Sequence, residues 1–279
     1  MAARLRYWLF RLLSALRWYG RAGTRYDVHS PFLSAFVREV YRDRRTFYAF
    51  GLIDRIRKYW SGQKQSIRLM ELGAPSRTTT STTRSAASLV SSNAIGNTSG
   101  RFLFRLCLWV RPARIIEFGT NAGISTLYLH LADTRTPLLT VEGNPEVAEL
   151  ARTTFAKAQV SSSLCLFNDR FGDWLGAHGD LASERTLLFL DGNHQRQPTL
   201  DYVNALLPRL TTDSVIVVAD IHWSEEMETA WEDLQKLPAV TASVDLYHFG
   251  LLFLRPELNG PHITLIPTRY KPWRVGFFS

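Results

Sequence analysis

Residues 115–132, IIEFGTNAGISTLYLHLA, decide the fold prediction for this chain. The stretch begins with an apolar run that is typical of a buried strand and ends with apolar residues at helical spacing. Between the two lie an acid, Glu117, and two glycines four positions apart, Gly119 and Gly123. A strand, a glycine turn and a helix in this order indicate a doubly wound sheet, in which ligands lie beyond the carboxyl ends of the strands.

The spacing of these residues indicates the kind of ligand. It differs from the G-x-G-x-x-G pattern that presents helix N–H groups to a pyrophosphate, and a carboxylate at the strand tip would repel that group. An NAD-dependent dehydrogenase is therefore disfavoured. A cofactor with a cationic amino group suits Glu117, and we expect the two glycines to let it approach the backbone. Glu142 ends the next strand, 23 residues after Gly119, where it can accept both hydroxyls of a ribose.

Short β-rich runs alternate with helical runs from Arg101 onward, which is the pattern of a parallel sheet with crossover helices. The predicted strands are 114–118, 138–142, 164–167, 187–191, 215–220, 243–248 and 251–255, and the predicted helices are 122–132, 145–157, 173–177, 198–210 and 225–237. Only two residues separate the last two strands, so these must form an antiparallel hairpin. We predict an α/β fold: a doubly wound, Rossmann-like, mostly parallel sheet of seven strands that ends in this hairpin.

More than half of the chain, residues 101–255, resembles the class I S-adenosylmethionine-dependent methyltransferases. EFGTNAGIST is similar to their first motif and LLTVEGNPE to their second, while TLLFLDGNHQ and VIVVADIHW resemble strands of the O-methyltransferase branch typified by catechol O-methyltransferase. The resemblance implies methyl transfer to an oxygen, less often a nitrogen, of a small-molecule acceptor. It also implies a set of cofactor-binding residues: Glu117, Gly119, Thr120, Asn121, Gly123, Ser125, Glu142, Gly143, Asn168, Asp169, Phe171 and Asp191. For Asn168 and Asp169 the alternative interpretation is an ordinary turn.

Two acids end neighbouring strands of the predicted sheet, so Asp191 and Asp220 should face one crevice. In catechol-type enzymes equivalent acids bind Mg²⁺, although Ile221 here replaces the expected amide ligand. His194 and His222 follow these acids closely, and either could remove a proton from an acceptor, or merely hydrogen-bond the backbone. We expect Asp191, His194 and His222 to be catalytic, with a possible metal at Asp191 and Asp220.

The N-terminal part of the chain carries its excess of positive charge. Residues 1–60 hold 13 Lys/Arg against 4 acids, whereas the rest of the chain is close to neutral. Leu5, Trp8, Leu9, Leu12, Leu13 and Leu16 form one helical stripe flanked by arginines. This basic helix could pack on its own domain or on a twin subunit, lie on an anionic membrane surface, or serve targeting or nucleic-acid binding.

The domain prediction has three parts: a basic helical extension over residues 1–75, a linker or lid over 76–100 and the methyltransferase domain over 101–279. Further helices are expected at 31–43 and 47–60, and 13 Ser/Thr occur between Ser76 and Ser99 with no apolar stripe. No apolar run is long enough to span a membrane, and the two cysteines lack the spacing of a disulfide framework or zinc site. We expect a cytoplasmic protein that could associate with a membrane surface.

Other functions remain open at this stage. A non-catalytic module that retains the methyltransferase fold is the main alternative, and the missing amide ligand at Ile221 mildly favours it. A nucleic-acid substrate is not expected, because the chain lacks the Asn/Asp-Pro-Pro-Tyr run of base methylation and the proline-flanked cysteine of cytosine methylation.

Overall fold

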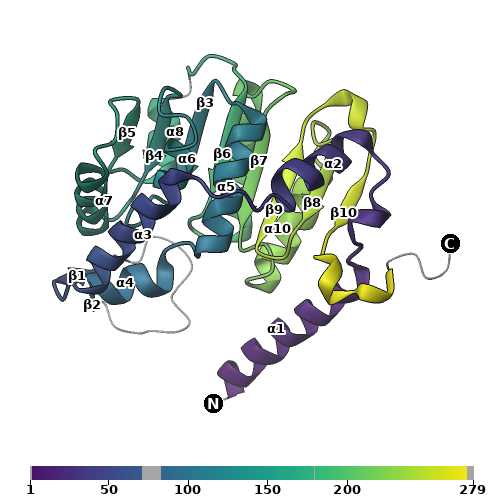
Figure 1. The fold of residues 1–279 in the computed structure, drawn as a ribbon, viewed down its shortest axis with the longest axis horizontal. Helices are drawn as coiled ribbons and strands as arrows, with labels where there is room; N and C mark the ends of the chain where they lie inside the picture. Colours follow the sequence, from purple (N-terminus) through teal and green to yellow (C-terminus); the bar gives the residue numbers. More distant parts are fainter. Residues whose placement is uncertain (1, 71–82, 179, 275–279) are drawn as a thin grey trace.

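An eight-stranded sheet forms the centre of the molecule (Figure 1) in the computed structural model, which describes residues 2–70, 83–178 and 180–274. The strand order is β10-β8-β9-β7-β6-β3-β4-β5; β9 runs antiparallel to both of its neighbours, and the other adjacent pairs are parallel. The bounds are β3 Arg114–Phe118, β4 Leu138–Val141, β5 Leu164–Phe167, β6 Thr186–Leu190, β7 Val215–Ala219, β8 Ala242–Asp245, β9 Phe249–Phe253 and β10 His262–Thr264. The Rossmann-like sheet and its hairpin are confirmed.

The sheet has one strand more than the seven predicted. Strand β10 pairs in parallel with β8 through three residues. A run of three residues is too short to show the alternation that identifies a strand, so the sequence pattern could not reveal it.

Helices cover both faces of the sheet and create separate cores. The bounds are α5 Asn97–Val110, α6 Ile124–His130, α7 Pro145–Ala158, α8 Phe171–Ala177, α9 Arg196–Leu206 and α10 Glu225–Gln235. Side chains alternate along β3, so Ile116 and Phe118 join the core that includes α9 and α10, while Ile115 joins the core that includes α5. Helix α5 was not predicted, because a helix buried on most of its surface has no polar stripe to mark its period.

The N-terminal part contains more structure than helices alone. It comprises α1 Ala2–Arg21, α2 Pro31–Phe36 with a π-helical turn Val37–Tyr41, α3 Tyr48–Ser61, β1 Ser66–Arg68, β2 Thr83–Ser85 and α4 Ala86–Asn93. Ser30 caps α2 and Pro31 opens it, as the sequence predicts. Short 3-10 turns occur at Arg25–Asp27, Leu207–Arg209, Pro256–Leu258, Thr268–Tyr270 and Pro272–Arg274.

The predicted linker over 76–100 is structured wherever it is described. Residues 76–82 lie outside the described residues, but β2, α4 and the start of α5 occupy most of 83–100. Three apolar side chains of α4, those of Ala86, Leu89 and Val90, are buried in the core that also contains α3. Their burial stabilises a helix in spite of the Ser/Thr-rich composition of the segment. The division into three domains stays a prediction.

Helix α1 turns its apolar stripe toward solvent. Leu5, Trp8, Leu9, Leu12, Leu13 and Leu16 are 46% to 71% exposed, and Figure 1 shows the helix projecting beyond the sheet. The opposite face makes the contacts: Ser14 is buried, Trp18 Nε1 donates to Asp245 Oδ1 at 2.9 Å, and Arg17 pairs with Glu228 at 2.9 Å. The prediction that the stripe packs on its own domain is therefore wrong.

Candidate active site

The loop after β3 bends sharply at the carboxyl edge of the sheet. Gly119 has φ +103° and Gly123, which precedes α6, has φ +79°, a region that favours glycine. A Cβ at Gly119 would lie 2.2 Å from the carbonyl oxygen of Asp191, and one at Gly123 would lie 2.6 Å from the ring of Phe155. Both glycines are therefore required by the chain's own packing, a reason that differs from the ligand approach expected from the sequence.

Glu142 joins the loops that follow β3 and β4. Its carboxylate accepts the backbone N–H of Asn121 at 2.8 Å and that of Asn144 at 2.9 Å. Burial raises the pKa of Glu142, while the backbone N–H groups, including that of Gly143, act in the opposite direction. The side chain is half-buried, so a carboxylate is fixed at the edge where a ribose was predicted.

Glu117 lies beneath the edge, where it is fully buried. Its Oε2 accepts the hydroxyls of Thr126 at 2.5 Å and Thr140 at 2.7 Å, and its Oε1 is buried without a partner among the described residues. Burial raises the pKa of Glu117 to about 7, against the effect of these hydroxyls and that of Ser125. A buried carboxylate with one free oxygen fits a cationic amino group from a ligand, which would supply the missing donor.

The remaining predicted cofactor residues surround this pair. The hydroxyls of Thr120 and Thr140 are 2.5 Å apart, which ties the β3 loop to β4. The side chain of Asn168 donates to the carbonyl of Glu142 at 2.7 Å, and the N–H of Asp169 donates to the same oxygen at 3.2 Å. These hydrogen bonds attach both residues to the backbone of Glu142, so the bend at Asp169 borders that residue.

Phe171 stacks on Phe118 with ring centroids 4.9 Å apart and an interplanar angle of 8°. Its ring also passes the backbone of Gly192, where a Cβ would come within 2.6 Å. The ring therefore closes the gap between the β3 end and the loop after β6, beside the bend at Asp169.

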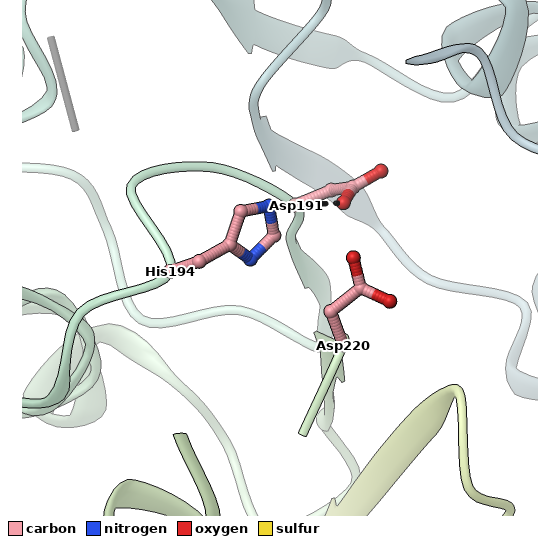
Figure 2. Close-up of side chains that lie close together, drawn as sticks. All are labelled: Asp191, His194 and Asp220. Atoms are coloured by element: carbon pink, nitrogen blue, oxygen red, sulfur yellow. Dashed lines mark ion pairs between the residues drawn. The ribbon is translucent and has the colours of Figure 1, made fainter. Parts of the chain in front are cut away.

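Asp191, His194 and Asp220 converge at the ends of β6 and β7 (Figure 2), and one ligand atom from each lies within 4.8 Å of the others. His194 Nε2 is 3.9 Å from Asp191 Oδ1. Three residues here adopt left-handed backbone conformations that are strained for non-glycine residues: Asn193 with φ 68°, His194 with φ 40° and Asp220 with φ 54°. Such strain persists where the surrounding structure imposes it, and it concentrates at functional sites.

The electrostatics of this cluster favour binding a proton or a cation. Burial, with a contribution from the charge of Asp220, raises the pKa of Asp191 to about 7, and burial lowers the pKa of His194. Two carboxylates and an imidazole also form a donor set that divalent metals accept. Ile221, at the position where the resemblance would place an amide ligand, is buried in the core that contains α10.

His222 lies outside this cluster. Its Nδ1 is 2.8 Å from Glu228 Oε1 and its Nε2 is 3.0 Å from Asp245 Oδ2, so both ring nitrogens are occupied. Burial alone would lower the pKa of His222, but the two carboxylates outweigh it and raise the pKa. Sequence proximity to Asp220 suggested a catalytic base, yet the side chain turns toward α1, where Ser14 also bonds Glu228. No signal in the sequence marks Glu228 or Asp245 as its partners.

The chain is similar to known methyltransferases, both in a family model and in solved structures. Residues 116–221 match the model of a family described as a methyltransferase domain. No curated protein matches the sequence significantly.

Three solved structures illustrate the likeness of the fold. An SAH-bound methyltransferase from Podospora anserina has a TM-score of 0.55 at 14% identity, with 82% of this chain and 98% of that chain covered. An O-methyltransferase from Bacillus cereus in complex with SAH has a TM-score of 0.54 at 15% identity, with coverage of 79% and 96%. An O-methyltransferase from Streptomyces achromogenes involved in tomaymycin synthesis, in complex with SAM, has a TM-score of 0.52 at 18% identity, with coverage of 80% and 96%. Residues 116–221 thus match a methyltransferase domain, and the chain shares the fold of these solved methyltransferase structures.

Proposed function

We propose that this chain transfers the methyl group of S-adenosylmethionine to an oxygen atom of a small-molecule acceptor. The observation that carries the proposal is the convergence of Asp191, His194 and Asp220 at the carboxyl edge that also bears Glu117 and Glu142. The matched methyltransferase domain, residues 116–221, spans these positions.

The cofactor would be held by the residues around the β3 and β4 ends. Glu142 would accept the ribose hydroxyls, the free oxygen of Glu117 would accept a donor from the amino group, and the bend at Asn168 and Asp169 with Phe171 would border the adenine. Gly119 and Gly123 shape the loop around which these groups are arranged. When bound, S-adenosylmethionine supplies a methyl group on a cationic sulfur and leaves as a neutral thioether.

The chain's own chemistry would be proton removal from the acceptor hydroxyl. Asp191 has a pKa of about 7, which is close to the optimum for a general base at neutral pH, and His194 is adjacent to it. A divalent cation such as Mg²⁺, held by Asp191 and Asp220, would serve the same end by lowering the pKa of the hydroxyl. Either role places the acceptor oxygen beside the cluster.

The cofactor site is tested by calorimetric titration with S-adenosylhomocysteine. We expect Glu142→Ala to weaken binding roughly tenfold to a hundredfold, because hydrogen bonds to charged groups contribute ~1.5–3 kcal/mol. Glu149→Ala is the matched control, since that carboxylate lies on the exposed surface of α7 and pairs with Arg152. Circular dichroism melts establish that both variants fold.

The outcomes separate the alternatives. Wild-type protein that ignores S-adenosylhomocysteine, or equal affinity in wild type and Glu142→Ala, contradicts the proposed site. Binding without methylation of any acceptor in a broad hydroxyl panel would instead favour a non-catalytic module with the same fold.

We further propose that α1 rests on an anionic membrane surface. Its six exposed leucine and tryptophan side chains form one stripe, and the helix contains arginines but no acidic residue. A second copy of the same helix would bring like charges together, whereas anionic lipid headgroups would complement them. Within the described ranges no helix is long and apolar enough to cross a bilayer, so the contact would be peripheral.

A further inference from the structure

A cavity of about 980 Å³ lies beside the β8–β9 turn. Its walls come from residues 40–44, the first turns of α5, the β8–β9 turn and residues 266–269. His248 of the β8–β9 turn lines the cavity, and its carbonyl accepts the backbone N–H of Asp220 at 2.8 Å. One lining residue of the cavity, His248, is thus hydrogen-bonded to Asp220 of the proposed reaction centre. The volume of the cavity is in the range of small-molecule sites.

The inner wall of the cavity is apolar. The rings of Phe102 and Phe249 stack with centroids 5.7 Å apart and an interplanar angle of 23°, and Val40 and Ile266 line the same space. An apolar lining of this kind favours a ligand with an apolar or aromatic body.

The rest of the lining is strongly basic. Five arginines contribute to it, namely Arg25, Arg42, Arg44, Arg105 and Arg269, against one carboxylate. That carboxylate, Asp43, is already neutralised by Arg45 at 2.9 Å and Arg105 at 3.4 Å. The cavity thus has a large excess of positive charge.

Four of the arginines have no acidic partner. Within residues 2–70, 83–178 and 180–274, none of Arg25, Arg42, Arg44 and Arg269 forms an ion pair. Arg25 and Arg269 lie over the neighbouring tyrosine rings, at 4.4 Å and 4.7 Å from the centroids, while Arg42 and Arg44 are exposed. Guanidinium groups that share a cavity with an excess of positive charge repel one another, and an oxyanion would relieve that repulsion.

We propose that this cavity binds the methyl acceptor and that the acceptor carries a phosphate or carboxylate group on an apolar, aromatic-type body. The apolar body rests against Phe102 and Phe249, the oxyanion meets Arg42, Arg44 and Arg269, and the hydroxyl lies toward Asp220. That the bound molecule is the methyl acceptor rests on the proposed function. The binding site itself is inferred from the cavity and its charges alone.

The test is calorimetric titration of the full chain, saturated with S-adenosylhomocysteine, with three probes of one shape: 1-naphthyl phosphate, 1-naphthoate and 1-naphthol. We expect at least one anionic probe to bind and 1-naphthol to bind more weakly, with affinity falling as ionic strength rises. Comparison of the two anions distinguishes a phosphate site from a carboxylate site.

Charge variants assign the binding to the cavity. We expect Arg42→Glu with Arg44→Glu to weaken the anionic probe about tenfold or more, and Arg42→Lys with Arg44→Lys to retain most of it. Arg55→Glu, at an exposed position of α3 away from the cavity, should leave binding unchanged. Arg42 and Arg44 make no ion pair with any residue that the structure describes, so their substitution should not unfold the chain.

Two results overturn the inference. The first is that neither anion binds more tightly than 1-naphthol. The second is that the double glutamate variant binds the anion with the affinity of wild type. Affinity for S-adenosylhomocysteine, measured on the same samples, tests the proposed function separately. If the protein binds S-adenosylhomocysteine but fails the probe test, only the proposal of an anionic acceptor is contradicted.

Discussion

At the scale of single residues, Glu117 combines a structural cost with a proposed binding role. A buried carboxylate with one unpartnered oxygen holds its proton more firmly in the folded state than in the unfolded state, since its pKa is about 7 against an ordinary 4.5. Its contribution to stability is complete below its ordinary pKa and is lost as pH rises through about 7. The charge that opposes folding at neutral pH is the charge that an ammonium group of a ligand would meet.

Glu117→Gln separates these two effects. The variant keeps an oxygen for the Thr126 and Thr140 hydroxyls but removes the titration, so we expect its melting temperature to exceed that of wild type above about pH 7 and to match it near pH 4. Its affinity for S-adenosylhomocysteine should fall. Thermal melts across this pH range provide the measurement, and a difference between the two proteins that does not change with pH would contradict the assignment.

Single residues of the site were predicted as far as strand ends could place them. Glu142, Asp191 and Asp220 were found because an acid that ends a strand must lie at the carboxyl edge. The burial of Glu117 and the partners of His222 were not predicted. The direction of a side chain depends on contacts with segments that are distant in sequence, such as those of His222 with Ser14 and Asp245. The basic cavity was missed for the same reason, since its arginines come from both ends of the chain.

At the scale of elements, α1 is fixed to the domain through its polar face. His222 is held between the carboxylates of Glu228 and Asp245, and Ser14, Arg17 and Trp18 of α1 bond the same two acids. Periodicity predicted this helix correctly, yet it could not reveal which face packs. Apolar spacing normally identifies the buried side, and here buried polar contacts determine it.

We expect His222→Gln to loosen α1. Removing the cation takes the charged partner from Asp245 and leaves Glu228 with Arg17 as its cation, and breaking a buried ion pair costs about 3 kcal/mol. The raised pKa of His222 means that wild type should also lose this stability as pH rises through that pKa, whereas the variant should not. Hydrogen exchange of residues 2–21, corrected for intrinsic rates, measures both effects.

His178→Gln is the control for this experiment. The ring of His178 stacks on Trp174 with centroids 4.5 Å apart, and this pair is distant from α1 in sequence. Equal protection of α1 in His222→Gln and wild type at every pH would show that the helix is held by other contacts.

At the scale of the whole molecule, charge and exposed apolar surface gather on one side of a domain that is otherwise near neutral. The sheet positions the acid cluster, and the segments flanking it provide the basic cavity. Helix α1 extends beyond the sheet (Figure 1). The positions of the central strands and their parallel arrangement followed from alternation in the sequence. How the N-terminal and C-terminal segments meet over the sheet did not, because that arrangement depends on long-range pairs such as Gly23 with Leu265.

The last prediction concerns binding of the whole protein to lipid. Wild type should sediment with vesicles of phosphatidylglycerol mixed with phosphatidylcholine and only weakly with phosphatidylcholine alone, because apolar insertion and anionic attraction act together. Leu12→Glu with Leu16→Glu should abolish the binding, since both side chains are more than half exposed, while Tyr48→Glu, 88% exposed on α3, should not. Sedimentation velocity without lipid decides between partners: a wild-type dimer that the leucine variant dissociates would assign the stripe to a second copy of the chain and overturn the membrane proposal.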